Sequence, residues 1–204
     1  MSNVLNSLLP EYQFTEHHMT VVLATPERTF EAVEAMDLGD STIARVLMNL
    51  WRIPARLVIK PPPDRNMSVD DFIQLVRQPP TDLARGLIGG RNAPKDKQAI
   101  DAESFRAFNE PGCIKLVWAF WLTDLGDDRV RVDTETRVLC TDDKTLRVFR
   151  FYWYAIRLWS GLIRLRLLAS IKRHAESRVG KTDKYWDTKM ADAVNAAWWG
   201  LRHP

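Results

Sequence analysis

The chain has 204 residues, of which 46% are hydrophobic and 27% charged, and this suits one folded domain with room for a short appendage. Lys and Arg number 29 against 26 Asp and Glu, so a generally basic nucleic-acid-binding surface is not expected. Two cysteines in a chain of this length form no disulfide framework, and nothing near them has zinc-ligand spacing. The first ten residues lack the features of a secretory signal, so we expect reduced thiols in a cytoplasmic protein.

The first part of the chain predicts a strand followed by two short helices. Residues 12–24 are dense in β-branched and aromatic side chains and contain neither Gly nor Pro, which favours a strand. The cap, the proline and the acid at 25–27 are typical of a helix start, and that helix reaches Met36. Ser41 predicts the cap of a second helix, which ends just before Pro54.

Short runs separated by turn residues predict an antiparallel meander in the middle of the chain. The predicted strands are 72–78, 83–90, 104–108, 113–123 and 129–141. In the last of these strands Val130, Val132, Thr134 and Thr136 alternate with Arg131, Asp133, Glu135 and Arg137. We expect the Val and Thr side chains to point inward and the charged ones to point outward.

Residues 142–177 predict one long helix with a basic surface. Two acids at its start suit the helix dipole, and Gly161 marks a predicted kink. One continuous stripe of apolar residues follows helical spacing: Leu146, Phe149, Trp153, Ile156, Ile163, Leu167 and Ile171.

Nine Lys or Arg and two acids lie within 143–178, so the modest net charge conceals a basic helix. Four arginines between 148 and 171 each cost about 2.5–3.5 kcal/mol at a bilayer centre, which excludes a membrane span. Two interpretations remain open. The arginines pair with acids such as Asp127, Asp128 and Glu135, or they form a peripheral contact with anionic lipid.

Five segments carry a resemblance to a known superfamily. They are LLPEYQFTEHH, ATPERTFEAV, LWRIPARL, DTETRV and RFYWYAIRLWSGLIRLRLLASIKRHAE, and together they span about residues 5–177. They are similar to an uncharacterised bacterial branch of the SRPBCC, or Bet v 1-like, superfamily, which includes START and polyketide-cyclase proteins. Leu158 stands where that branch has proline, and residues 178–204 extend beyond the usual end of the family.

The resemblance implies an α+β helix-grip fold over residues 1–177, in which a curved antiparallel sheet wraps around the long C-terminal helix. It further implies a cavity between sheet and helix that binds a hydrophobic small molecule, such as a lipid, polyketide or isoprenoid-like compound, without metal or cofactor. The expected ligand-binding residues are Phe14, Trp118, Phe120, Thr134, Phe149, Tyr152, Trp153 and Ile156. Their rings suit a flat or acyl ligand, although each ring equally suits the packing of a core.

An enzyme in the same cavity is the alternative. His18 matches a histidine that this branch places in its first strand, and by alternation it shares a face with Phe14 and Glu16. Because the first and last strands of helix-grip folds are neighbours, we expect His18 near Thr134 or Glu135. A cyclase, dehydratase or hydrolase acting on a polyketide-like substrate would use His18 or Glu16 as general base. A structural or surface role is the competing interpretation.

Residues 178–204 predict a separate amphipathic helix. Trp186, Met190, Val194 and Trp198 recur every four residues and form a narrow aromatic stripe. Such a stripe is not left in water, so it packs back on the domain, closes the cavity mouth or docks on another subunit. A third function is therefore a protein-interaction module, with residues 182–199 as a homo-oligomer contact.

Overall fold

The computed structural model describes residues 3–35, 72–96 and 99–177, without the side chains at 155, 156, 158–160, 162 and 163. In chain order the elements are α1 (Asn3–Leu8), β1 (Phe14–Val22), α2 (Pro26–Ala35), β2 (Ile73–Gln78), β3 (Asp82–Gly90), α4 (Ala102–Ala107), β4 (Cys113–Gly126), β5 (Arg129–Cys140) and α5 (Asp143–Glu176). The predicted helix that starts at Ser41 and the predicted extension lie outside the described residues.

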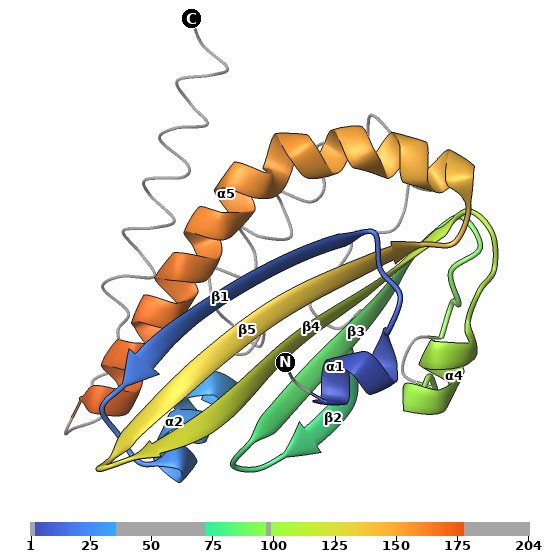
Figure 1. The fold of residues 1–204 in the computed structure, drawn as a ribbon. Helices are drawn as coiled ribbons and strands as arrows, with labels where there is room; N and C mark the ends of the chain where they lie inside the picture. The colour runs from blue at the N-terminus through green and yellow to red at the C-terminus, as the bar shows by residue number, and fades with distance from the viewer. Residues whose placement is uncertain (1–2, 36–71, 97–98, 178–204) are drawn as a thin grey trace, which may run out of the picture.

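The described residues form an α+β structure built on one five-stranded antiparallel sheet (Figure 1). The strand order is β1-β5-β4-β3-β2, so β1 at one edge pairs with β5, the last strand of the chain. The tight turn between β4 and β5 places Asp127 and Asp128 in the left-handed region, at φ values of 53° and 51°. Aspartate tolerates this region, and such a turn matches the twist of the two strands that it joins.

Most of the predicted elements are confirmed. The strands expected at 12–24, 72–78, 83–90, 113–123 and 129–141 are β1, β2, β3, β4 and β5, with boundaries that differ by a few residues. The helix expected from 25–27 is α2, and the long helix expected over 142–177 is α5.

The strand predicted at 104–108 is wrong, because this segment belongs to the short helix α4. The Asp101 side chain accepts a hydrogen bond from the Ser104 backbone N–H at 2.8 Å, which caps the helix. Phe105 of α4 is buried against β3, where a Cβ on Gly86 would lie only 2.8 Å from the Phe105 ring. The close approach of α4 to the sheet therefore requires glycine at this position.

The sheet separates two hydrophobic clusters. The inner face, which we define as the face toward α2 and α5, carries the larger cluster, and it includes Phe14, Leu116 and Val132. The outer face lies toward α1 and α4, and its cluster includes Leu5 and Phe105. Figure 1 shows α1 in front of the sheet and α5 behind and above it. The inward orientation predicted for the Val and Thr side chains of β5 is confirmed, since they are buried on the inner face.

Both ends of α5 are fixed by side-chain hydrogen bonds. The Asp142 carboxylate accepts hydrogen bonds from the backbone N–H groups of Thr145 and Gly112, and these lower its pKa to about 2. At the other end, Glu176 accepts a hydrogen bond from the Leu23 backbone N–H at 2.8 Å. Between these ends α5 continues as helix through Gly161 and curves over the sheet (Figure 1). No helix among the described residues is long and apolar enough to cross a membrane.

Candidate functional site

A cluster of polar side chains lies between the sheet and α5 on the otherwise apolar inner face. It contains Glu16 and His18 from β1, Thr136 from β5 and Arg164 from α5, and we call it the inner polar cluster. His18 Nε2 lies 2.9 Å from Glu16 Oε1, and Arg164 Nη1 donates to the other carboxylate oxygen of Glu16. Arg164 Nη2 donates to Thr136 Oγ1 at 2.9 Å. One carboxylate therefore joins the long helix to the edge strand of the sheet.

Strand register and a glycine bring these groups together. Glu16 is paired with Thr136 and His18 with Thr134 in the β1–β5 ladder, so that all four share the inner face. Gly161 lies directly above them in α5. A Cβ at Gly161 would be 2.9 Å from Glu16 Oε1, which is closer than such contacts normally come. The absence of a side chain at this position lets α5 approach β1.

The inner polar cluster is largely shielded from solvent. The side chains of Arg164, Glu16 and His18 are 6%, 10% and 20% exposed. Burial lowers the pKa of Arg164, and the adjacent Glu16 opposes that effect. Because an arginine side chain is not deprotonated in proteins, a positive charge is held inside the molecule with Glu16 as its counter-ion. His18 is the most accessible member and the one through which a polar group entering from outside would meet the cluster.

An aromatic layer lies on the same face of the sheet as the inner polar cluster. The Phe14 ring lies 5.2 Å from the Phe149 ring and 5.3 Å from the Trp153 ring, measured between centroids. Trp118 packs on Phe120 at 5.1 Å. Such distances are typical of favourable tilted aromatic pairs.

Two polar groups of this layer are also buried. Trp118 Nε1 donates to Thr134 Oγ1 at 2.8 Å, and burial raises the pKa of the Tyr152 hydroxyl. The structure thus brings seven of the eight predicted ligand-binding residues together on the inner face: Phe14, Trp118, Phe120, Thr134, Phe149, Tyr152 and Trp153. The eighth, Ile156, has a side chain outside the described set.

The structure separates His18 from Glu135. His18 lies opposite Thr134 on the inner face, whereas Glu135 points to the outer face, as its alternation with Thr134 predicts. His18 is paired with Glu16 of its own strand instead. Sequence reasoning named both residues as candidate bases but did not predict that they contact each other.

Sequence reasoning missed Arg164, which it counted among the basic residues of a helix surface. A signal for its burial was present in the sequence. Arg164 precedes Leu167 by three residues and Ile171 by seven, so it lies on the same buried stripe as these two residues.

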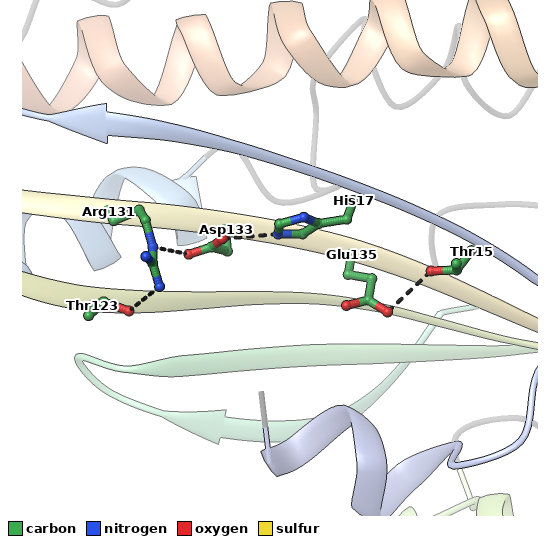
Figure 2. A network of polar contacts seen from close by, with 6 residues as sticks. All are labelled: Thr15, His17, Thr123, Arg131, Asp133 and Glu135. Atoms are coloured by element: carbon green, nitrogen blue, oxygen red, sulfur yellow. Dashed lines mark hydrogen bonds and ion pairs between the residues drawn. The ribbon is translucent and has the colours of Figure 1, made fainter. Parts of the chain in front are cut away.

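The charged residues of β5 form a second set of contacts on the outer face, and Figure 2 shows those of Arg131, Asp133 and Glu135. Asp133 Oδ1 lies 2.9 Å from His17 Nε2, while its Oδ2 accepts a hydrogen bond from Arg131 Nε at 2.8 Å. Glu135 Oε1 accepts hydrogen bonds from Thr15 Oγ1 at 3.1 Å and from Arg137 Nε at 2.7 Å. We call this set the outer charged ladder.

The charged side chains of β5 point to the outer face, as predicted, but three of them are buried there. Arg137 is only 1% exposed, and Asp133 and Glu135 are also buried. The cause is the N-terminal segment, in which α1 was not predicted: Arg137 Nη1 donates to Asn6 Oδ1 at 2.8 Å and to the Leu9 carbonyl at 3.2 Å. The Glu135–Arg137 part of the outer charged ladder is thus covered, and it binds the N-terminal segment to the sheet.

The arginines of the long helix were expected to pair with acids such as Asp127, Asp128 and Glu135. For Asp127 and Glu135 the structure shows other partners. Asp127 pairs with Arg129 at 3.6 Å, and Glu135 pairs with Arg137, so both partners come from β5. Arg164 of α5 does form an ion pair, but it points inward and its partner is Glu16 of β1.

The described residues offer no evident metal site or reactive thiol. They contain no group of three or more His, Cys, Asp or Glu side chains placed to hold a metal ion. Cys113 and Cys140 are buried and free, and burial raises the pKa of Cys140 to about 12. A thiol with such a pKa is a poor nucleophile at neutral pH.

These observations define an α+β protein in which a polar cluster and an aromatic layer lie between an antiparallel sheet and one long helix. No known protein-family model and no curated protein matches the chain.

Some solved structures are similar to it at low identity. A conserved protein from Geobacillus kaustophilus has 9% identity and a TM-score of 0.40, and the match covers 79% of this chain and 95% of that one. A hypothetical protein from Helicobacter pylori has 9% identity and a TM-score of 0.37, with 84% and 93% covered. A protein from Thermus thermophilus has 10% identity and a TM-score of 0.27, with 79% and 97% covered. Likeness at this level assigns neither a family nor an activity.

Proposed function

We propose that the chain is a helix-grip protein of the SRPBCC, or Bet v 1-like, superfamily that binds a hydrophobic small molecule between the sheet and α5. Three observations support this proposal. β1 pairs with β5, the last strand of the chain, and α5 lies against the inner face. The aromatic residues that the resemblance implies for the ligand gather on that face.

The inner polar cluster is the observation that carries the proposal. Removing a guanidinium and a carboxylate from water is costly, and apolar residues of similar volume often stabilise a core equally well or better. The Arg164–Glu16 pair lies in the one layer that an apolar ligand would enter. A ligand with an apolar body and a polar end would use this layer fully, since its body contacts the aromatic rings and its polar end reaches His18.

Tryptophan quenching tests where the ligand binds. A dibrominated fatty acid quenches an indole only on contact, and Trp118 and Trp121 lie on opposite faces of β4. We expect saturable quenching in the wild type, unchanged quenching amplitude in the matched control Trp121→Phe, and a clear loss of amplitude in Trp118→Phe/Trp153→Phe. Absence of saturable quenching, or equal amplitudes in all three proteins, contradicts the proposal. Native mass spectrometry of the purified protein shows in addition whether an apolar molecule accompanies it.

A second function, catalysis in the same layer, is favoured by the pairing of His18 with Glu16. A carboxylate that orients a histidine ring is the usual arrangement of a general base, and Arg164 holds the second oxygen of that carboxylate. The chemistry that fits is removal of a proton next to a carbonyl group of a polyketide-like substrate, as in a cyclase or dehydratase.

Hydrogen exchange at carbon tests this second function. We expect the wild type to accelerate deuterium exchange at the α-carbon of a β-ketoacyl thioester, followed by NMR, and His18→Gln to abolish the acceleration. Trp121→Phe on the opposite face is the matched control and keeps the wild-type rate. If His18→Gln exchanges the substrate as fast as the wild type, His18 is not the base.

A further inference from the structure

The side of α5 that faces away from the sheet is both apolar and basic. Phe151 and Tyr154 are 79% and 65% exposed, and Leu165 is exposed as well. Large apolar side chains are normally scattered singly on a soluble surface, whereas these three lie on one helix at spacings of three and eleven residues. In Figure 1 no described element covers this side of α5.

Exposed arginines flank these apolar residues. Arg147 precedes Phe151 by four residues, Arg150 precedes Tyr154 by four, and Arg157 follows Tyr154 by three, so each is a neighbour on the helix surface. All three are exposed, and Arg166 adds a fourth exposed guanidinium next to Leu165.

Negative charge is scarce along the same helix. Its acidic residues are Asp143 in the first turn and Glu176 in the last, and Glu176 is paired with Lys172 at 3.1 Å. In the middle of α5, exposed aromatic rings therefore lie among arginine side chains, and α5 itself contributes no carboxylate there.

We propose that this side of α5 is a docking surface for an anionic lipid membrane. A basic helix with Phe, Tyr and Leu on its exposed side lies in the plane of the bilayer, with its rings among the acyl chains and its arginines at the phosphate groups. Apolar insertion distinguishes this partner from a nucleic acid, which would use the charges but leave the rings in water. The proposal does not depend on a ligand in the inner layer, because the two sides of α5 are different surfaces.

Vesicle flotation of the full chain tests the proposal. We expect binding to vesicles of phosphatidylcholine mixed with phosphatidylglycerol and little binding to phosphatidylcholine alone. Binding weakens when NaCl rises from 0.1 to 1 M, because the screening length falls from about 10 Å to about 3 Å. Equal binding to both kinds of vesicle, or none to either, overturns the proposal, as does salt-sensitive binding to a short DNA duplex without binding to vesicles.

Substitutions separate the two contributions. Each basic residue at an anionic surface contributes roughly fivefold, so Arg150→Gln/Arg157→Gln is expected to lower partitioning more than tenfold. Phe151→Ser is expected to weaken binding at every salt concentration, because it removes an inserted ring and no charge. Met19→Ser, at another exposed apolar residue on β1, is the matched control and leaves binding unchanged. If Met19→Ser and Phe151→Ser behave alike, the apolar part of the surface is not used.

A fluorescent label reports insertion directly. The native thiols are buried, so Phe151→Cys and, as control, Met19→Cys provide single reactive sites for a polarity-sensitive dye. The dye at 151 is expected to gain emission with anionic vesicles, whereas the dye at 19 keeps its aqueous emission. Aqueous emission at both sites, despite binding, would show that the rings do not enter the bilayer and would overturn the proposed orientation. The label responds even if no ligand binds between the sheet and α5, so failure of the proposed function remains a separate result.

Discussion

The Glu16–Arg164 ion pair predicts a strongly non-additive pair of substitutions. Glu16→Gln removes the counter-ion of a guanidinium that is 6% exposed, and little water can take its place. Leaving one charge of a buried pair without its partner typically costs about 3–5 kcal/mol. For a chain of this length, each kcal/mol lowers the melting temperature by about 2–4 °C, so a fall of roughly 6–20 °C is expected.

The reverse substitution, Arg164→Met, is expected to cost less. Glu16 keeps His18 Nε2 as a partner at 2.9 Å, so its carboxylate is not left without a contact. The double variant Glu16→Gln/Arg164→Met buries neither charge. We therefore expect its loss of unfolding free energy to fall short of the sum of the two single losses by about 2 kcal/mol.

Urea denaturation at pH 7, followed by tryptophan fluorescence and far-ultraviolet circular dichroism, measures the free energy of unfolding of the wild type, the two single variants and the double variant. Arg131→Met is the matched control, since Arg131 pairs with Asp133 on the outer face but is 41% exposed. A half-exposed pair of this kind contributes about 0–1 kcal/mol. Additivity of Glu16→Gln and Arg164→Met within about 0.5 kcal/mol, or single losses no larger than that of the control, would refute the argument.

Further predictions concern two close approaches and one helix cap. Gly161→Ala adds about 1 kcal/mol of helix propensity but places a Cβ against the Glu16 carboxylate. Calorimetry is therefore expected to show a lower melting temperature than that of the wild type, not a higher one. Gly86→Ala is expected to lower the free energy of unfolding by about 1–3 kcal/mol in urea denaturation, because the added Cβ has no room. Gly89→Ala on the same strand is the control and is tolerated, since the nearest atom to its Cβ lies at 3.5 Å. Equal losses in the two variants would contradict this reasoning. The lowered pKa of Asp142 contributes stability at neutral pH that is lost as pH falls from about 4 through 2. Asp142→Asn is therefore less stable than the wild type at pH 6, and the difference shrinks as pH falls and vanishes below pH 2. A difference that does not change with pH would count against the assigned hydrogen bonds.

Alternation along the strands explains why the faces of the sheet could be predicted. Successive side chains of a strand point to opposite faces whatever surrounds them, so the separation of His18 from His17, and of Thr134 from Glu135, follows from the backbone alone. The long helix was predictable for a similar reason, since its apolar stripe persists over many turns.

The covering of the outer face could not be predicted in the same way. Helices α1 and α4 have six residues each, which is less than two turns and too short for a periodic signal. Because α1 was not expected, the burial of the charged side of β5 was not predicted, and the structure shows Arg137 donating to the carbonyl of Leu9, which directly follows that helix. The strand and its orientation were predicted correctly. What was not predicted is that α1 covers it, because no local sequence pattern indicates this helix.

The two charged sets have different consequences because they join different elements. The ladder groups drawn in Figure 2 come from the neighbouring strands β1, β4 and β5, so they hold one layer of the structure together. The inner polar cluster instead joins α5 to β1 across the layer in which we propose that a ligand binds. A molecule that separates α5 from β1 must also separate Arg164 from Glu16, and a buried charge without a partner is costly. A ligand that enters at this point therefore needs a polar group that replaces one member of the pair, whereas a purely apolar molecule is confined to the aromatic layer beside it.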